Sequence, residues 1–246
     1  MKIDLNCDMG ESFGQYKLGN DEAVMPFITS ANIACGFHAG DPVVMRGTIR
    51  LAKKYDIAIG AHPSWPDLQG FGRREMNLTA EETEAMILYQ IGALAAFAKA
   101  EGMELRHVKS HGALYNQAAK DRILANAIAR AVKSFSVDLI LVGLAGSSLI
   151  EAGAEVGLRV ANEGFPDRNY NPDGTLASRK QANAMIESPD EVAMHALKLV
   201  QNGIDFSGRH VNVDTLCLHG DNVRAAENAK QIGDVLAQSN ISIAAL

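Results

Sequence analysis

Seven short apolar segments rich in β-branched residues recur along this chain, and longer amphipathic segments separate them. The run Leu-Ile-Leu-Val at 139–142 is apolar throughout, which is typical of a strand covered on both faces. Strict alternation of strands and helices indicates a parallel sheet. The predicted strands lie near residues 2–7, 30–36, 56–61, 106–110, 138–143, 158–163 and 214–218.

The segments between these strands have helical periodicity. The strongest helix is expected over 80–101, where Thr79 and Glu82 have the spacing of a capping box and apolar residues recur every three or four positions. A second capping box is expected at Ser188 and Glu191, with proline at the first helical position. The predicted helices are 42–55, 80–101, 120–134, 147–156, 188–202 and 222–239.

Polar, chemically competent residues follow nearly every predicted strand. In (β/α) barrels the C-terminal ends of the strands carry the active site. We therefore predict an α/β fold in which residues 1–246 form one seven-stranded (β/α) barrel domain, with an open doubly wound sheet as the alternative. The residues expected to be catalytic are Asp8, Glu11, His38, Asp41, Lys109 and His219.

The amino-acid composition excludes several classes of partner and indicates where the protein is located. The chain has 246 residues, a net charge of −6 and no basic run, so nucleic acid and anionic membranes are not expected partners. The three cysteines fall inside predicted strands and form no CxxC motif, which favours buried, reduced thiols. A charged Lys2 leads directly into a strand, and no apolar run approaches the length of a membrane span. The expected location is the cytoplasm.

Asp4, Asn6 and Asp8 alternate along the first strand and therefore share one face. Buried carboxylates need a hydrogen-bond partner, a counter-ion or a metal. Three histidines at other strand ends could hold a divalent ion, or could act as acids and bases without one. The predicted metal ligands are His38, His62 and His219.

Lys109 lies in the middle of a predicted strand and shares a face with His107 and His111. A buried ammonium requires an anion nearby. Lys109 could pair with a carboxylate of the first strand as a purely structural contact, or could polarise a substrate carbonyl group.

Two polar connections, 62–78 and 164–183, are longer than ordinary turns and predict a lid or a binding wall. They contain the pairs Arg73-Arg74 and Asp167-Arg168. The segment 143–148 joins a strand to a helix, but it lacks the lysine of a phosphate-binding loop. A nucleotide would therefore bind unconventionally or on a partner.

Six motifs in order form a resemblance that runs from residue 2 to about 221. They are DLNCDMGESFG, ACGFHAGD, GAHPSWPD with GFGRR, VKSHGALYN, FPDRNY with DGTL, and CLHGD. The chain closely resembles the LamB/YcsF family, described as the A subunit of bacterial ATP-dependent 5-oxoprolinase. The resemblance implies a barrel of the glycoside hydrolase/deacetylase type. It also implies ATP-driven opening of the 5-oxo-L-proline lactam to L-glutamate, together with the B and C subunits of 5-oxoprolinase.

For that reaction, Asp8, Glu11 and Asp41 could hold Mg²⁺ or serve as the base, and ATP is the expected cofactor. Two other functions remain open: a metal-dependent amide or N-acetyl hydrolase that needs no ATP, and a non-catalytic protein that binds substrate for its partners. The residues expected to bind substrate are Asn6, His62, Arg73, Arg74, His111, Asp167 and Arg168.

Overall fold

The computed structural model describes residues 1–177, 181, 184–220 and 222–246. Among these residues, seven parallel strands close into a barrel, because β1 pairs with β2 on one side and with β9 on the other. The predicted closed barrel is confirmed, and the open sheet is excluded. The barrel strands are β1 (Lys2–Met9), β2 (Ser30–Ala34), β3 (Ala58–His62), β4 (Leu105–Lys109), β5 (Ile140–Leu144), β6 (Arg159–Gly164) and β9 (Thr215–Leu218).

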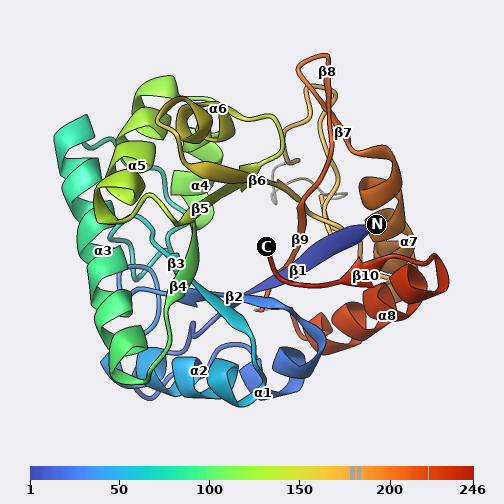
Figure 1. Ribbon diagram of the computed structural model, residues 1–246, viewed down its shortest axis with the longest axis horizontal. Helices are drawn as coiled ribbons and strands as arrows, with labels where there is room; N and C mark the ends of the chain where they lie inside the picture. The colour runs from blue at the N-terminus through green and yellow to red at the C-terminus, as the bar shows by residue number, and fades with distance from the viewer. Residues whose placement is uncertain (178–180, 182–183, 221) are drawn as a thin grey trace.

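Helices surround the barrel on its outside, as Figure 1 shows. All six predicted helices form, with ends within three residues of the expected positions. They are α2 (Pro42–Lys54), α3 (Ala80–Ala100), α5 (Arg122–Phe135), α6 (Ser148–Glu155), α7 (Pro189–Asn202) and α8 (Ala225–Gln238). Within the described part of the chain, no helix is long and apolar enough to cross a membrane.

The helix ends follow local sequence signals with one exception. Thr79 and Glu82 form the expected capping box of α3, and Asp41 accepts backbone hydrogen bonds at the start of α2. Ser188 occupies the N-cap position of α7, but its side chain makes no capping hydrogen bond. The predicted second capping box is therefore wrong, and Pro189 at the first helical position is the remaining start signal.

Several short elements were not expected from the sequence. They are α1 (Asp21–Val24), the 3₁₀ helix η1 (Met25–Phe27), α4 (Gly112–Ala118), β7 (Ile204–Phe206), β8 (Arg209–Val211) and β10 (Ser242–Ile243). The strands β7 and β8 form an antiparallel hairpin, and its turn residues Ser207 and Gly208 both have positive φ angles. Such elements are too short to produce a periodic pattern.

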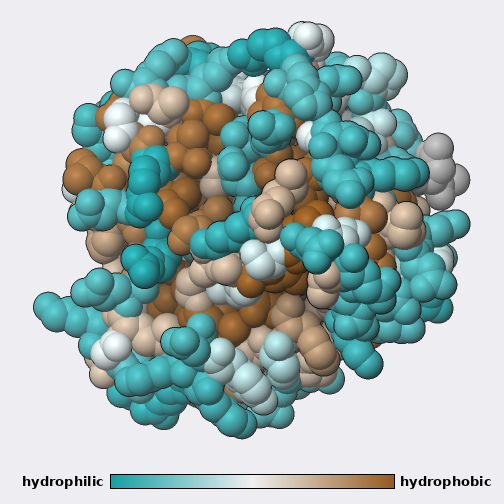
Figure 2. Space-filling model, turned by 45° about the vertical axis from the view of Figure 1, so that its right-hand side comes forward, coloured by the Kyte–Doolittle hydropathy of each residue, from teal (hydrophilic) through white to brown (hydrophobic). Residues whose placement is uncertain are grey.

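The two faces of β1 separate the apolar core from the polar interior. Ile3, Leu5, Cys7 and Met9 belong to the hydrophobic core that the barrel shares with its helices. The residues between them point into the barrel, as their contacts with distant strands show. The outer surface is mostly hydrophilic, and on the face drawn in Figure 2 the hydrophobic side chains gather in a central band.

The end of the barrel opposite the polar strand termini is apolar. Strand β10 pairs with the first residues of β1, at Lys2 and Ile3. Beyond it, Leu246 packs against a small cluster formed by Ile140, Val142 and Ala161. The C-terminal segment thus covers the amino ends of the strands, so the polar residues at their carboxyl ends are the candidates for a functional site.

Candidate active site

A polar network crosses the barrel interior. The Asn6 amide nitrogen on β1 donates to Glu163 Oε1 on β6 at 3.0 Å and to Thr215 Oγ1 on β9 at 2.6 Å. The Asn6 amide oxygen accepts from Asn32 on β2 at 2.7 Å. Strands β1 and β6 are not neighbours in the sheet, so these side chains meet across the interior. These neighbours hold Asn6 in place, and Asn6 in turn orients Glu163. Its contact with substrate stays a prediction.

Lys109 occupies the centre of this network. Its Nζ lies 2.9 Å from Asp8 Oδ1, 3.1 Å from Glu163 Oε1 and 2.8 Å from Cys217 Sγ. Burial opposes the charge on Lys109, but Asp8 and the other negative groups outweigh it and hold the lysine pKa well above its ordinary value. The predicted pairing of Lys109 with a carboxylate of the first strand is confirmed, and the ammonium stays charged.

Asp8 connects the lysine to the neighbouring histidines. Its Oδ1 also lies 3.4 Å from His62 Nε2 and accepts a hydrogen bond from Asn32 at 2.9 Å. Burial disfavours the ionised carboxylate, but the contacts with His62 and Lys109 outweigh that effect and hold the Asp8 pKa well below its usual range. Asp8 is therefore a buried, ionised carboxylate that contacts both the Lys109 ammonium and the His62 ring.

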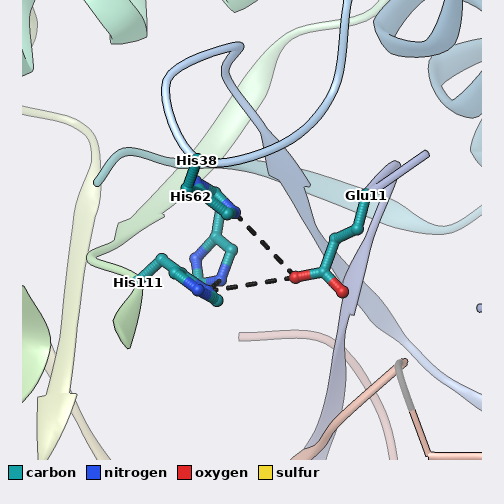
Figure 3. A group of neighbouring side chains, drawn as sticks. All are labelled: Glu11, His38, His62 and His111. Carbon is teal, nitrogen blue, oxygen red and sulfur yellow. Dashed lines mark hydrogen bonds and ion pairs between the residues drawn. The ribbon is translucent and has the colours of Figure 1, made fainter. Parts of the chain in front are cut away.

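Three histidine rings and one carboxylate form a second cluster beside Asp8, drawn in Figure 3. The rings of His38 and His111 stack with centroids 3.9 Å apart, and His111 Nδ1 lies 3.0 Å from His62 Nε2. Glu11 Oε1 lies 3.9 Å from both His38 Nε2 and His111 Nδ1. Burial lowers the pKa of His38 and of His111 well below the ordinary value, so both rings are neutral.

The 62–78 connection forms a wall over this cluster. The Phe71 ring meets the rings of His38 and His111 edge to face, with centroids 5.6 and 5.1 Å away. Gly72 has a φ of +65°, and a Cβ there would lie 2.9 Å from atoms of both histidines. Only glycine allows the backbone to approach the two rings this closely. The loop therefore covers the histidine cluster, while its predicted role in binding stays a prediction.

His219 and Asp167 form a separate pair at the mouth of the barrel. His219 Nδ1 donates to Asp167 Oδ2 at 2.8 Å, and the His219 ring stacks on Phe165 with centroids 5.6 Å apart. The Asp167 side chain is buried, while 13% of the His219 side chain remains exposed. His219 can therefore reach a bound molecule, and Asp167 fixes its tautomer.

The structure divides the predicted metal ligands into two groups. His38 and His62 have His111 and Glu11 as neighbours, whereas His219 lies with Asp8 and Cys217. Within each group, one ligand atom from every residue lies within 4.8 Å of the others. The residues that lie beside His38 and His62 are thus His111 and Glu11, and not His219 as predicted.

Some predicted residues lie outside both groups. Asp41 caps α2 and also accepts from the Gly14 backbone, so its carboxylate serves the local loop structure. Arg74 is exposed and forms an ion pair with the buried Asp67. Arg73 lies with its guanidinium carbon 4.8 Å from the Phe71 ring centroid, close to the histidine cluster. Asp221, which follows His219 in its motif, lies outside the described residues.

Arg168 follows Asp167 in the chain but has a different role. It is buried and donates to the carbonyl oxygen of Ala177, which holds the 164–177 part of the long connection together. This contact accounts for the burial of Arg168, and its predicted contact with substrate stays a prediction.

Glu163 and Cys217 were missed as functional residues. Glu163 is fully buried, its Oε1 contacts Lys109, and its carboxylate interacts with the buried Tyr115 hydroxyl. It stands at the end of the predicted strand 158–163, so a carboxylate at the end of an apolar strand was the available signal. Cys217 had no such signal, because a cysteine in an apolar strand is usually a core residue.

Fold and site together define a (β/α) barrel with an interior of paired carboxylates, a buried lysine and clustered histidines. The LamB/YcsF family model matches residues 3–246, and the chain belongs to this family. The 5-oxoprolinase A subunit of Pyrococcus horikoshii is 54% identical over 247 residues, covering 99% of this chain and 97% of that protein. The protein of the same name in Tolumonas auensis is 52% identical over 249 residues, covering 100% and 99%.

Solved structures agree with this assignment. The "Lactam Utilization Protein" of Thermus thermophilus superposes with a TM-score of 0.92 at 47% identity, and each chain is covered completely. The catalytic domain of a peptidoglycan N-acetylglucosamine deacetylase from Eubacterium rectale gives a TM-score of 0.53 at 9% identity, covering 100% and 88%. The second likeness concerns the fold alone, and it places the chain among barrels of the deacetylase type.

Proposed function

We propose that this protein is the A subunit of an ATP-dependent 5-oxoprolinase, an enzyme that opens the lactam of 5-oxo-L-proline to give L-glutamate. ATP is hydrolysed to ADP and phosphate in the process, and the B and C subunits complete the enzyme. The names of relatives that are more than half identical over nearly the whole chain support this proposal. The observation that carries it is the buried Lys109 ammonium, held between Asp8 and Glu163 at the carboxyl ends of the strands.

A buried cation suits the chemistry of a lactam. The carbonyl group of a five-membered cyclic amide is a poor electrophile, and phosphorylation of its oxygen provides a good leaving group. As that oxygen attacks the γ-phosphate of ATP and ADP leaves, the transferred phosphoryl oxygens carry the negative charge, and a preorganised cationic donor in a water-poor site stabilises it. Lys109 is the donor we assign, because its charge is secured by Asp8 and Glu163 before substrate arrives.

The second requirement is proton transfer. One water loses a proton as it attacks the activated carbon, and the ring nitrogen gains a proton as the C–N bond breaks. This step leaves the new carboxyl group as an acyl phosphate, and a second water then releases the phosphate. His219, oriented by Asp167 and partly exposed, is the group we assign to these transfers. Glu163, a buried carboxylate beside Lys109, is the second candidate base.

A different function would follow if the barrel hydrolysed an amide without ATP. The histidine cluster with Glu11 and the deacetylase-type fold favour this second candidate. A bound divalent ion would then supply a Lewis acid and an activated water. Amidase activity of the isolated chain in the absence of ATP distinguishes this function. Ligand binding without turnover, in the chain and in the mixture, would indicate a protein that only presents substrate.

The test of the main proposal measures glutamate release and ADP formation together. We expect the isolated chain to show little hydrolysis of 5-oxoproline, with or without ATP and Mg²⁺. Addition of the B and C subunits should restore turnover in which glutamate and ADP appear in step, because partner surfaces close the site and supply the nucleotide groups. The complex assembled with Lys109→Met is the matched control. ATP-coupled turnover by the chain alone would contradict the partner requirement.

A further inference from the structure

Four buried side chains from four separate segments converge beside Asp8, and Figure 3 shows them directed toward one another. Glu11 follows β1, His38 follows β2, His62 ends β3 and His111 follows β4. One ligand atom from each lies within 4.8 Å of every other. Packing alone does not explain why four polar groups from successive strands share one dry volume.

The hydrogen bonds of two histidines fix which nitrogen carries the proton. His62 Nδ1 lies 2.7 Å from the carbonyl oxygen of Lys109, and His111 Nε2 lies 2.9 Å from that of Phe71. A carbonyl oxygen only accepts, so each of these nitrogens is a donor. The remaining nitrogens, His62 Nε2 and His111 Nδ1, then present lone pairs to each other across 3.0 Å. Two lone pairs at this distance repel each other unless a proton or a metal cation lies between them, and a bound metal ion would satisfy both at once.

His38 provides an independent observation. Its side chain is fully buried, and among the described residues neither ring nitrogen has a hydrogen-bond partner. An imidazole without a hydrogen bond is costly to bury, and its Nε2 faces Glu11 Oε1 at 3.9 Å, on the side of the same cluster. The ring is therefore accounted for if a nitrogen binds an ion.

We propose that Glu11, His38, His62 and His111 form a binding site for a divalent transition-metal ion of the Zn²⁺ type. Three imidazole nitrogens and one carboxylate oxygen match the ligands of Zn²⁺, Co²⁺ or Mn²⁺, whereas Mg²⁺ and Ca²⁺ prefer oxygen. Zinc–nitrogen bonds of about 2.0–2.1 Å in a tetrahedron place ligand atoms about 3.3 Å apart. The observed separations of 3.0 and 3.9 Å need only small side-chain movements to reach that geometry.

The surroundings also match those of metal-bound histidines. Such histidines usually donate their second N–H to a backbone carbonyl or a carboxylate, which fixes the ring. His62 and His111 both do so. The carbonyl that holds His62 belongs to Lys109, whose ammonium pairs with Asp8, so the metal site and the lysine share supports. The inference does not depend on 5-oxoprolinase activity, since it concerns metal binding by the chain itself.

The experiment uses the untagged protein, stripped of metal with a chelator and then dialysed. Zn²⁺ is titrated against a competing chelator, bound metal is counted by elemental analysis, and Co²⁺ substitution is followed by its visible absorption. We expect a single tightly bound ion, a Co²⁺ spectrum of nitrogen-rich tetrahedral coordination, and a higher melting temperature with Zn²⁺. Failure of the wild-type protein to bind such an ion would overturn the proposal.

Variants locate the ion. His38→Gln and His111→Gln should each weaken binding by at least about 100-fold, more than loss of an outer hydrogen bond typically does. His210→Gln, at an exposed histidine of the β7–β8 hairpin, should bind as the wild type does. Circular dichroism checks that each variant is folded. If a histidine variant does not fold, Glu11→Gln is the milder change with which the same site is tested. Binding that survives these changes but is lost in His219→Gln would place the ion in the Asp8, Cys217 and His219 group and refute the assignment.

The experiment on metal binding and the experiment on 5-oxoproline hydrolysis can give negative results independently of each other. ATP-coupled turnover by the assembled complex, with the chain free of metal, would leave the proposed reaction standing and remove only the ion's role in it. If the protein binds one metal ion per chain but the assembled complex never opens the lactam, the metal site stands and the proposed reaction is wrong.

Discussion

The carboxylate of Asp167 lies 2.8 Å from Nδ1 of His219, so the Nε2 atom of that ring is the one left for a substrate. We expect His219→Gln to lower kcat by about 10²–10⁴-fold, the usual contribution of a general acid–base group. Asp167→Asn should give a smaller loss in kcat with little change in KM, because the ring keeps its place on Phe165 but loses its fixed tautomer.

Steady-state kinetics of the assembled complex check this prediction. Asp190→Asn, in the first turn of α7 and away from the site, is the matched control and should match the wild type. A change in KM alone for Asp167→Asn would assign the pair to substrate binding.

Lys109→Met should affect both activity and stability. Removal of the ammonium leaves Asp8 and Glu163 buried without their counter-ion, which typically costs about 3–5 kcal/mol of stability. Loss of a donor to the developing oxyanion costs about 10²–10³-fold in rate. Urea unfolding and turnover, measured at a temperature where the variant is folded, separate the two effects.

The double variant with Glu163→Gln should recover part of the lost stability but none of the activity, because it removes one uncompensated charge. Lys99→Met, at an exposed position of α3, is the control for the lysine change. Normal turnover in folded Lys109→Met would remove this residue from the mechanism.

Gly60 on β3 provides space for the His107 ring. A Cβ at position 60 would overlap three atoms of that ring, which is itself fixed by the contact of His107 Nε2 with Asn32 Oδ1 at 2.7 Å. Gly60→Ala should therefore lower stability by about 1–3 kcal/mol. Gly47→Ala, in α2 where an added methyl group meets nothing within 4 Å, should raise it by about 0.5–1 kcal/mol. Equal effects of the two changes on urea unfolding would contradict the packing argument.

Glu101 links α2 to α3 and gives one part of the pH dependence of folding. Hydrogen bonds from Arg50 and Arg46 lower its pKa from 4.5 to about 2. The folded-state pKa is the lower one, so the stabilisation is fully present above pH 4.5 and is lost as the pH falls toward 2. Glu101→Gln should remove this component, and replacing both arginines by glutamine should do the same. Unfolding free energies measured at several acidic pH values test this, and an unchanged slope in Glu101→Gln would argue against it.

The strand order and the location of the site were predictable because they depend on local patterns. The barrel strands coincide with short, largely apolar segments, and polar residues at or just after the ends of β1, β2, β3, β4 and β9 gather at one end of the barrel. Lys109 was assigned to the interior by simple alternation with Val108, and its burial agrees. These features require no knowledge of which strands face each other.

The detailed partners could not be predicted, because they depend on the barrel's closure and stagger. Glu163 on β6 contacts Lys109 on β4 inside the barrel. The number of residues between them in the sequence does not predict this contact, because it depends on the stagger of the strands. The same applies to His38, which stacks on His111 rather than meeting His219. Asp41 caps α2, and the sequence could not reveal this role because a cap at a helix start and a catalytic carboxylate have the same local signature.

The pairing of β1 with β9 has a consequence for biosynthesis. Asp4 on β1 receives a hydrogen bond from Ser30 early in the chain, but its bond from Thr215 comes 211 residues later. A nascent chain that has not yet reached β9 therefore carries the open edge of β1 and a half-satisfied set of carboxylates. Contacts of such long sequence separation form slowly, and the exposed strand edge favours association with other chains meanwhile. The last barrel strand to leave the ribosome is thus the one that both closes the barrel and brings Cys217 and His219 to the candidate site.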